Sequence, residues 1–155
     1  LFLFFRKIPY LCQIKQQTTM SHILAHNTVL DFIFAGNALF TCRNTKSGNR
    51  FTFKVTKHKK DDVFFVKVLT NPDVYEFIGS IRKESAYKHS PKSRISTEAQ
   101  SVRVFDFLVN KLRTNTLPEF VEIWHEGRCG RCGRTLTVPE SIESGFGPEC
   151  VKKSK

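Results

Sequence analysis

Three cysteines near the carboxyl end of the chain have the clearest potential for chemistry. Cys129 and Cys132 lie two residues apart, Cys150 follows further along, and His125 precedes all three. Thiolate and imidazole are the ligands that zinc prefers, and the C-x2-C spacing is typical of one half of a tetrahedral site. The sequence therefore predicts a structural Zn²⁺ site whose four ligands are His125, Cys129, Cys132 and Cys150.

The residues around the cysteines favour this interpretation. Gly130 and Gly133 give the backbone the freedom to turn both thiolates toward one ion. Pro139 suits the first position of a short helix or turn, and Gly145 suits its end. The Gly-Pro-Glu sequence before Cys150 favours a second turn, whose partial positive charge at its start would stabilise the thiolate.

Two alternatives for these cysteines remain open. Cys129 and Cys132 could form a redox dithiol or a disulfide, with His125 an ordinary surface histidine. A redox C-x2-C usually follows a strand and opens a helix, whereas glycines surround these two cysteines. Cys42 lies in an apolar run, where a buried, unreactive thiol is expected. An odd total of five cysteines does not suggest a disulfide framework and favours a reducing cytoplasm.

The hydrophobic pattern upstream predicts an α+β fold. Alternation between apolar and polar residues predicts antiparallel strands, and spacings of three and four predict helices. We expect a short helix over residues 27–36, one long helix over residues 96–113, and strands over residues 38–43, 51–57, 63–69, 75–81 and 119–124. The predicted fold is an antiparallel four- to five-stranded meander packed on one long helix, with a C-terminal zinc ribbon or treble-clef-like module. The fifteen phenylalanines fit the core of such a sheet better than a set of stacking platforms.

The chain divides into three predicted parts. Residues 1–19 begin with a run of leucine and phenylalanine but lack the basic region of a signal peptide, and the first methionine is Met20. We expect this segment to be a disordered or mis-started leader. Residues 20–124 are expected to form the sheet and helix domain, and residues 125–155 the zinc-binding module with its basic tail. The sequence contains no apolar stretch long enough to cross a membrane.

The composition is strongly basic. Lysine and arginine number 25 against 14 acidic residues, giving a formal net charge of +11. Such a balance favours a polyanionic partner, with DNA or RNA first, although a soluble protein without such a partner also tolerates it. The loop over residues 82–94 is rich in cations and is either a phosphate grip or a solvated connection. The candidate contact residues are Arg128, Arg131, Arg134, Lys88, Lys92, Arg94, Lys152 and Lys153.

The chain resembles a family of small proteins of unknown function from bacteriophages, prophages and plasmids. The segments that carry the resemblance are Phe32–Ala38, Arg50–Val55 and above all His125–Cys150. The likeness extends from about His22 to Cys150, and its most specific part is the signature H-x3-C-G-R-C-G-R…G-F-G-P-E-C. It implies a zinc-binding protein of a mobile element, with His125 and the three cysteines at the family's metal-ligand positions. It implies no activity.

These observations support three classes of function. The first is a non-enzymatic nucleic-acid-binding module of a phage or mobile element, acting in the cytoplasm of a bacterial host cell. The second is a protein-interaction factor that acts on a host or defence protein. The third is a zinc-dependent hydrolase or nuclease, which needs an open coordination position. Four protein ligands would leave no such position, but water could complete the sphere if His125 were not a ligand. The oligomeric state is left open.

Overall fold

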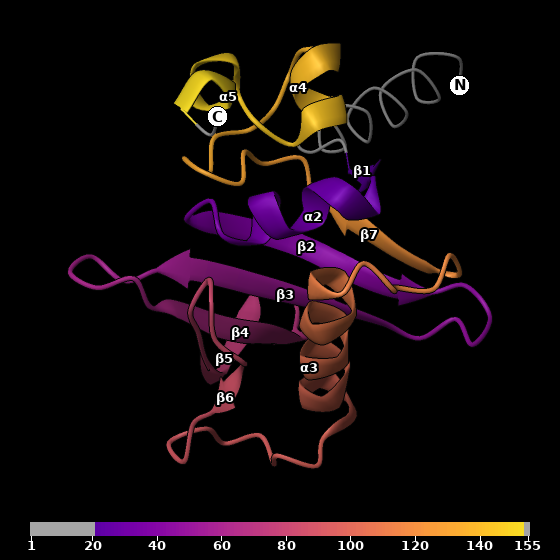
Figure 1. Cartoon of the computed structure of the whole chain (residues 1–155), viewed down its shortest axis with the longest axis vertical. Coiled ribbons are helices and arrows are strands. Elements are labelled where there is room, and N and C mark those ends of the chain that lie inside the picture. The colour runs from indigo at the N-terminus through magenta and orange to yellow at the C-terminus, as the bar shows by residue number, and fades with distance from the viewer. Residues whose placement is uncertain (1–20, 154–155) are drawn as a thin grey trace, which may run out of the picture.

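A seven-stranded antiparallel sheet forms the centre of the fold, and the strands lie in the order β1-β7-β2-β3-β4-β5-β6 (Figure 1). The computed structural model describes residues 21–153, so the expected leader over residues 1–19 lies outside the described residues. The strands are β1 (His22–Leu24), β2 (Asn37–Asn44), β3 (Arg50–Lys57), β4 (Phe64–Asn71), β5 (Val74–Ile81), β6 (Lys88–His89) and β7 (Val121–His125).

The alternation of side chains gives the sheet two different faces. On β3, Phe53 and Val55 are buried, whereas Lys54 between them is exposed. Because successive side chains of a strand point to opposite faces, each strand contributes one apolar row to the core. The turn between β2 and β3 is held by Asn44, whose Oδ1 accepts hydrogen bonds from the backbone N–H groups of Lys46 and Ser47.

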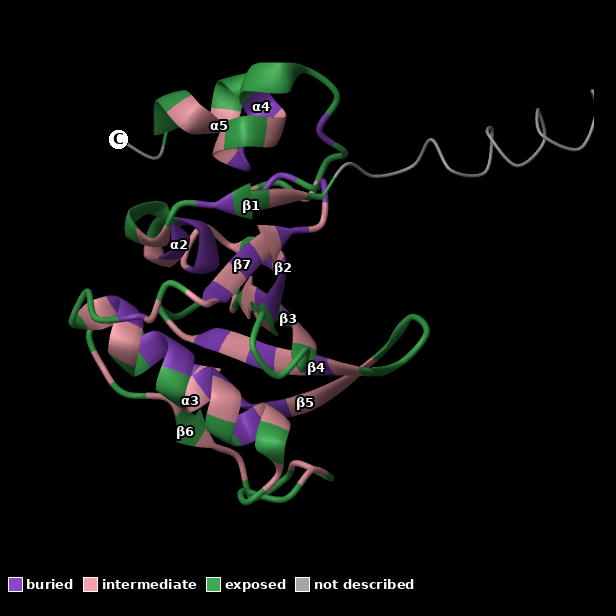
Figure 2. Cartoon of the chain, turned by 90° about the vertical axis from the view of Figure 1, so that its right-hand side faces the viewer, coloured by how far each residue is buried: buried purple, intermediate pink, exposed green. Residues whose placement is uncertain are grey.

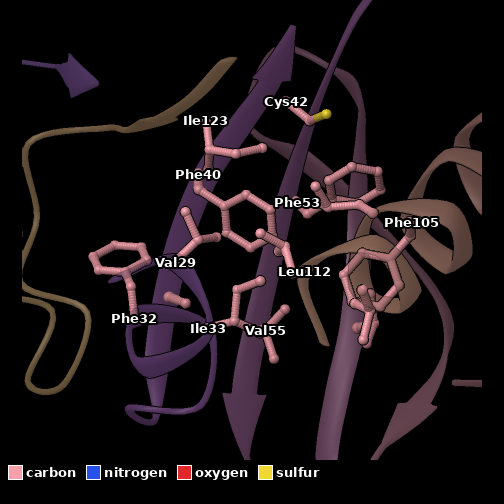
Figure 3. Close-up of a cluster of buried hydrophobic side chains, with 14 of the residues drawn as sticks. Val29, Phe32, Ile33, Phe40, Cys42, Phe53, Val55, Phe105, Leu112 and Ile123 are labelled. Atoms are coloured by element: carbon pink, nitrogen blue, oxygen red, sulfur yellow. The ribbon is translucent and has the colours of Figure 1, made fainter. Parts of the chain in front are cut away.

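Two helices cover one face of the sheet, namely α2 (His26–Ile33) and α3 (Gln100–Arg113) (Figures 1 and 2). Ile33 of α2 and Phe105 of α3 are fully buried against the sheet (Figure 3). Phe32 of α2 is also fully buried, and its ring lies 5.8 Å from that of Phe146 between centroids. The rings of Phe105 and Phe53 lie 5.2 Å apart between centroids. Burial of this apolar layer is the main contribution to the stability of the domain.

The sheet and its helical cover are larger than the sequence predicted. The expected four to five strands become seven, and two helices rather than one pack on the sheet. The short strands β1 and β6 were not expected, because runs of three and two residues carry no measurable alternation. Helix α3 begins at Gln100 rather than Ser96, since residues 96–99 form a turn closed by the hydrogen bond from Ala99 N–H to the carbonyl oxygen of Ser96.

Strand β7 connects the sheet to the C-terminal segment. It lies between β1 and β2, with His125 opposite Phe40 on β2 and opposite His22 on β1. The chain then leaves the sheet and forms two short helices, α4 (Pro139–Ser144) and α5 (Pro148–Lys153), which lie together at the top of Figure 1. Within residues 21–153, none of the helices combines the length and apolar character needed to cross a membrane.

Candidate metal centre

A tight turn after β7 positions the first two cysteines. The amide of Cys129 donates to the carbonyl oxygen of Arg134 at 2.8 Å, and the amide of Gly133 donates to the carbonyl oxygen of Cys129 at 2.9 Å. Gly133 adopts a φ of +77°, a conformation that glycine reaches at little cost. Arg128 and Thr135 form a short antiparallel bridge on either side of the turn. This loop is therefore a compact knuckle whose two cysteines can face one point.

The second half of the site comes from the two short helices. Pro139 opens α4, and Gly145 ends it in the left-handed conformation, as the sequence predicted. Cys150 lies in the first turn of α5, where its amide donates to the carbonyl oxygen of Gly147 at 3.0 Å. The amide of Gly130 donates to the carbonyl oxygen of Gly145 at 3.0 Å and thereby ties the knuckle to the end of α4.

These elements bring three sulfur atoms together. The Sγ atoms of Cys129, Cys132 and Cys150 all lie within 4.8 Å of one another. Three sulfurs bound to one zinc at about 2.3 Å in a tetrahedron would be about 3.8 Å apart, so the cluster is close to the spacing that zinc requires. None of the three cysteines forms a disulfide. The arrangement is a candidate metal centre with three thiolate ligands.

The electrostatics of the cluster also fit a cation. Burial acts to raise the pKa of Cys129, but hydrogen bonds from the backbone amides of Cys132, Gly147 and Arg131 outweigh it, so the pKa is lowered. The Arg131 amide lies 3.4 Å from this sulfur. Burial and the neighbouring sulfurs of Cys129 and Cys132 raise the pKa of Cys150 to about 11. Burial and this repulsion together outweigh the favourable turn expected at Cys150, so a bound cation would be needed to hold Cys150 as a thiolate at neutral pH.

His125 does not join the cluster. Its side chain is fully buried, and Nε2 donates a hydrogen bond to the carbonyl oxygen of Ile142. Nδ1 accepts a hydrogen bond from the amide of Gly127 at 3.0 Å. Both ring nitrogens therefore have backbone partners, and no lone pair remains for a metal. The structure corrects the expected ligand set, because it brings together the three cysteines and not His125.

A comparison with protein families matches this part of the chain. Residues 124–155 are similar to DUF6011, a family of unknown function. No curated protein and no solved structure matches the chain. The DUF6011-like segment contains all three clustered cysteines together with α4 and α5.

The structure separates the basic residues that the sequence nominated into two groups. Arg128, Arg131 and Arg134 lie on the knuckle, and Lys152 and Lys153 end α5, all within the DUF6011-like segment. Lys88 belongs to β6, and Lys92 and Arg94 follow it. Strand β6 lies five strands away from β7, or roughly 24 Å at the usual strand spacing. The two groups therefore do not form one continuous surface.

A groove beside α2 gathers a different set of cations. It has a volume of about 600 Å³. Among the described residues that line it, Asp31 is the one acidic residue. Two of its cations, Arg131 and Lys153, come from the DUF6011-like segment and were nominated from the sequence. Lys83 belongs to the loop over residues 82–94, which the sequence marked as a possible phosphate grip. Lys57 and Arg113 were missed because they lie far apart in the chain, and only the fold brings them to this groove. The five cations of this basic groove are Lys57, Lys83, Arg113, Arg131 and Lys153.

Proposed function

We propose that this protein is a non-enzymatic nucleic-acid-binding protein of a phage or other mobile element, stabilised by one structural zinc ion. The observation that carries the proposal is the basic groove, in which the cysteine module and the sheet domain each contribute cations. The mobile-element origin and a bacterial cytoplasmic location rest on the resemblance and on the cysteine content described above.

Zinc would be the main stabilising element of the C-terminal module. The buried residues between Gly127 and Lys153 are few and include only two large apolar side chains, Leu136 and Phe146. Small modules with so little apolar core depend on metal binding for their folding. A knuckle with two cysteines, a short β-bridge and a final helix that supplies the third cysteine together resemble a treble clef. We propose that zinc joins α5 to the knuckle in this manner.

The groove suits a phosphate backbone because backbone segments that carry its cations are held in place. Arg113 donates hydrogen bonds to the carbonyl oxygens of Arg82, Lys83 and Ser85, so this arginine fixes the segment that carries Lys83. On the opposite side, Arg131 lies between the two knuckle cysteines and Lys153 ends the helix that carries Cys150. Zinc binding would therefore fix two of the five cations, and phosphate contacts would dominate the affinity.

The test is binding of labelled single- and double-stranded DNA and RNA, followed by fluorescence anisotropy. The double variant Lys83→Glu, Lys153→Glu should weaken binding about tenfold or more, and affinity should fall steeply with salt. The matched control is Lys59→Glu, Lys60→Glu, which makes the same charge change at exposed positions outside the groove. Equal affinity of the two double variants, or no binding at low salt, would overturn the proposal.

One observation favours a zinc-dependent hydrolase or nuclease as the second candidate. Three cysteines leave the fourth tetrahedral position for an external ligand, and a cavity of about 380 Å³ adjoins them. Its lining includes Ser141. Among the described residues that line this cavity, Glu149 is the one acidic residue. We rank this candidate second because three anionic sulfurs neutralise much of the charge with which zinc would activate water. Zinc-dependent cleavage of oligonucleotides that is lost in Glu149→Gln would reverse this ranking.

A further inference from the structure

The face of the sheet opposite α2 and α3 has an unusual composition. Within residues 21–153, no helix packs on this face, and we call it the open face (Figure 2). A solvated face of an antiparallel sheet is normally lined by polar side chains. Here the outward positions of the long strands carry aromatic rings, and cations lie beside them. The strand registers place Trp124, Tyr75, Phe65 and Phe77 on this face.

Trp124 stands at one end of a row of hydroxyl groups, and Tyr75 lies opposite Leu69 further along the open face. Trp124 lies opposite Thr41, and Thr41 lies opposite Thr52. The hydroxyl groups of Thr41 and Thr52 are 2.7 Å apart, and Thr41 also donates to Glu126 at 2.5 Å. Tyr75 lies on β5, four strands from β7, so about 19 Å separates the two rings at the usual strand spacing. These polar groups line a groove of about 500 Å³ together with Trp124, Arg43 and Arg50, and Tyr75 lies outside its lining.

The indole of Trp124 is fixed in place. Its Nε1 donates to Oε2 of Glu122 at 3.0 Å, and the side chain remains partly exposed. Further along the open face, Lys54 lies over the ring of Tyr75, with 5.4 Å between Nζ and the ring centroid. A partly exposed ring held in one orientation is a preformed stacking surface for a flat ligand.

The open face places like charges opposite each other at two positions of the sheet. Arg43 lies directly opposite Arg50 on β3 and directly opposite Glu122 on β7, and Lys54 lies directly opposite Lys67. Like charges at directly opposed positions destabilise an antiparallel pair. Within residues 21–153, none of these four side chains takes part in an ion pair. An anionic ligand would relieve the repulsion of both pairs, and most of all that of Lys54 and Lys67, because their other cross-strand neighbours are Leu39 and Phe77 rather than acids.

We propose that the open face binds single-stranded nucleic acid, with phosphates at the two cation pairs and bases stacked on Trp124 and Tyr75. Stacking of this kind needs bases whose faces are accessible, and a duplex does not offer them. The proposal rests on the proposed nucleic-acid function and names its ligand class and a second contact surface. The basic groove carries cations but is not lined by these rings, so it would supply phosphate contacts alone.

The test uses the full chain and its single tryptophan. Binding of oligo-dT should quench the emission of Trp124, whereas duplex DNA of the same length should leave the emission unchanged. By anisotropy, Trp124→Leu and Tyr75→Leu should each weaken binding of labelled oligo-dT about fivefold or more. Phe107→Leu is the matched control, because Phe107 is an exposed aromatic residue on α3 and therefore lies outside the open face. A second variant, Arg50→Glu, should weaken binding while raising the melting temperature, because it replaces a repulsive pair with Arg43 by an attractive one.

The outcomes separate this proposal from the nucleic-acid function on which it rests. Absence of oligonucleotide binding in anisotropy would overturn both. Binding that leaves the emission of Trp124 unchanged, with Trp124→Leu and Tyr75→Leu binding like the unchanged protein, would overturn the open face and retain the basic groove. The same result is expected if a protein or a second copy of the chain occupies this face. Quenching by oligo-dT together with loss of affinity in Arg50→Glu would support the proposal.

Discussion

His125 at the end of β7 donates a hydrogen bond from Nε2 to the carbonyl oxygen of Ile142 in α4. The carbonyl can only accept, so the proton resides on Nε2, and Nδ1 accepts from the amide of Gly127. The ring of His125 also lies 6.1 Å from the ring of Phe32 between centroids. A single buried imidazole therefore connects the sheet, the cysteine module and α2.

Replacement of His125 by alanine should reduce stability and leave the metal in place. The change leaves the Gly127 amide and the Ile142 carbonyl without their partner and creates a cavity, which together cost about 2–4 kcal/mol. We expect one zinc per chain by elemental analysis and a lower urea midpoint. Cys132→Ser provides the comparison, because it should lose the metal. Loss of zinc from His125→Ala with the sheet still folded would restore His125 as a ligand.

The buried imidazole should also make stability depend on pH. Burial lowers the pKa of His125 below 6.5, with a further decrease from His22, although the hydrogen bond to Ile142 opposes the shift. The folded protein therefore favours the neutral ring. The neutral ring of His125 contributes its full stabilisation at pH values above 6.5, the pKa of the unfolded state. This contribution is lost as the pH falls through the lower pKa of the folded state. The free energy of unfolding should fall between about pH 7.5 and about pH 5.5, and this decrease should be smaller in His125→Gln. Equal slopes in the two proteins, measured by urea unfolding with zinc release monitored in parallel, would contradict the assignment.

The four described cysteines should divide into a reactive group and an inert one. After zinc is removed by a chelator, an alkylating reagent should modify Cys129, Cys132 and Cys150, and bound zinc should protect all three. Cys42 should resist in both states, because burial raises the pKa of its thiol to about 12. Mass spectrometry of the alkylated chain gives the measurement, and Cys42→Val is the control that should retain zinc. Protection of only one of the three clustered cysteines would argue against a shared metal.

The sequence predicted the local chemistry of the cysteine module better than its ligand set. Pro139 and Gly145 delimit α4 as expected, because proline and glycine act through the backbone of their own segment. The role of His125 depends on α4 folding back over β7, a contact that no spacing reveals. The three cysteines were found because the C-x2-C pattern and the turn before Cys150 are local signals.

In the sheet, too, the sequence predicted features that depend on one segment and did not predict pairings between distant segments. Strands β2 to β5 follow from the alternation within each segment, and they lie next to one another in chain order. The insertion of β7 between β1 and β2 was not predictable from spacing, since it depends on pairing between segments far apart in the chain. The same pairing places Trp124 beside Thr41 on the open face. An aromatic residue in an alternating strand cannot be assigned to a face until its neighbours are known.

Two glycines of the knuckle should be intolerant of alanine for different reasons. Gly133 has a φ of +77°, where a Cβ atom costs about 1–2 kcal/mol. At Gly130 a Cβ atom would lie 2.7 Å from two carbon atoms of the Phe32 ring. Phe32 is fully buried, and its ring also contacts that of Phe146 at 5.8 Å between centroids.

Because the Phe32 ring cannot move aside, Gly130→Ala should displace the knuckle and weaken zinc binding. Gly133→Ala should lower the melting temperature and have a smaller effect on zinc binding. Gly147→Ala is the matched control, since a Cβ atom there would meet no atom within 4 Å. Thermal melts and competition with a chromophoric zinc chelator give both quantities. If Gly130→Ala matched Gly147→Ala in melting temperature and in zinc affinity, the packing of the knuckle on α2 would not be needed to hold the metal.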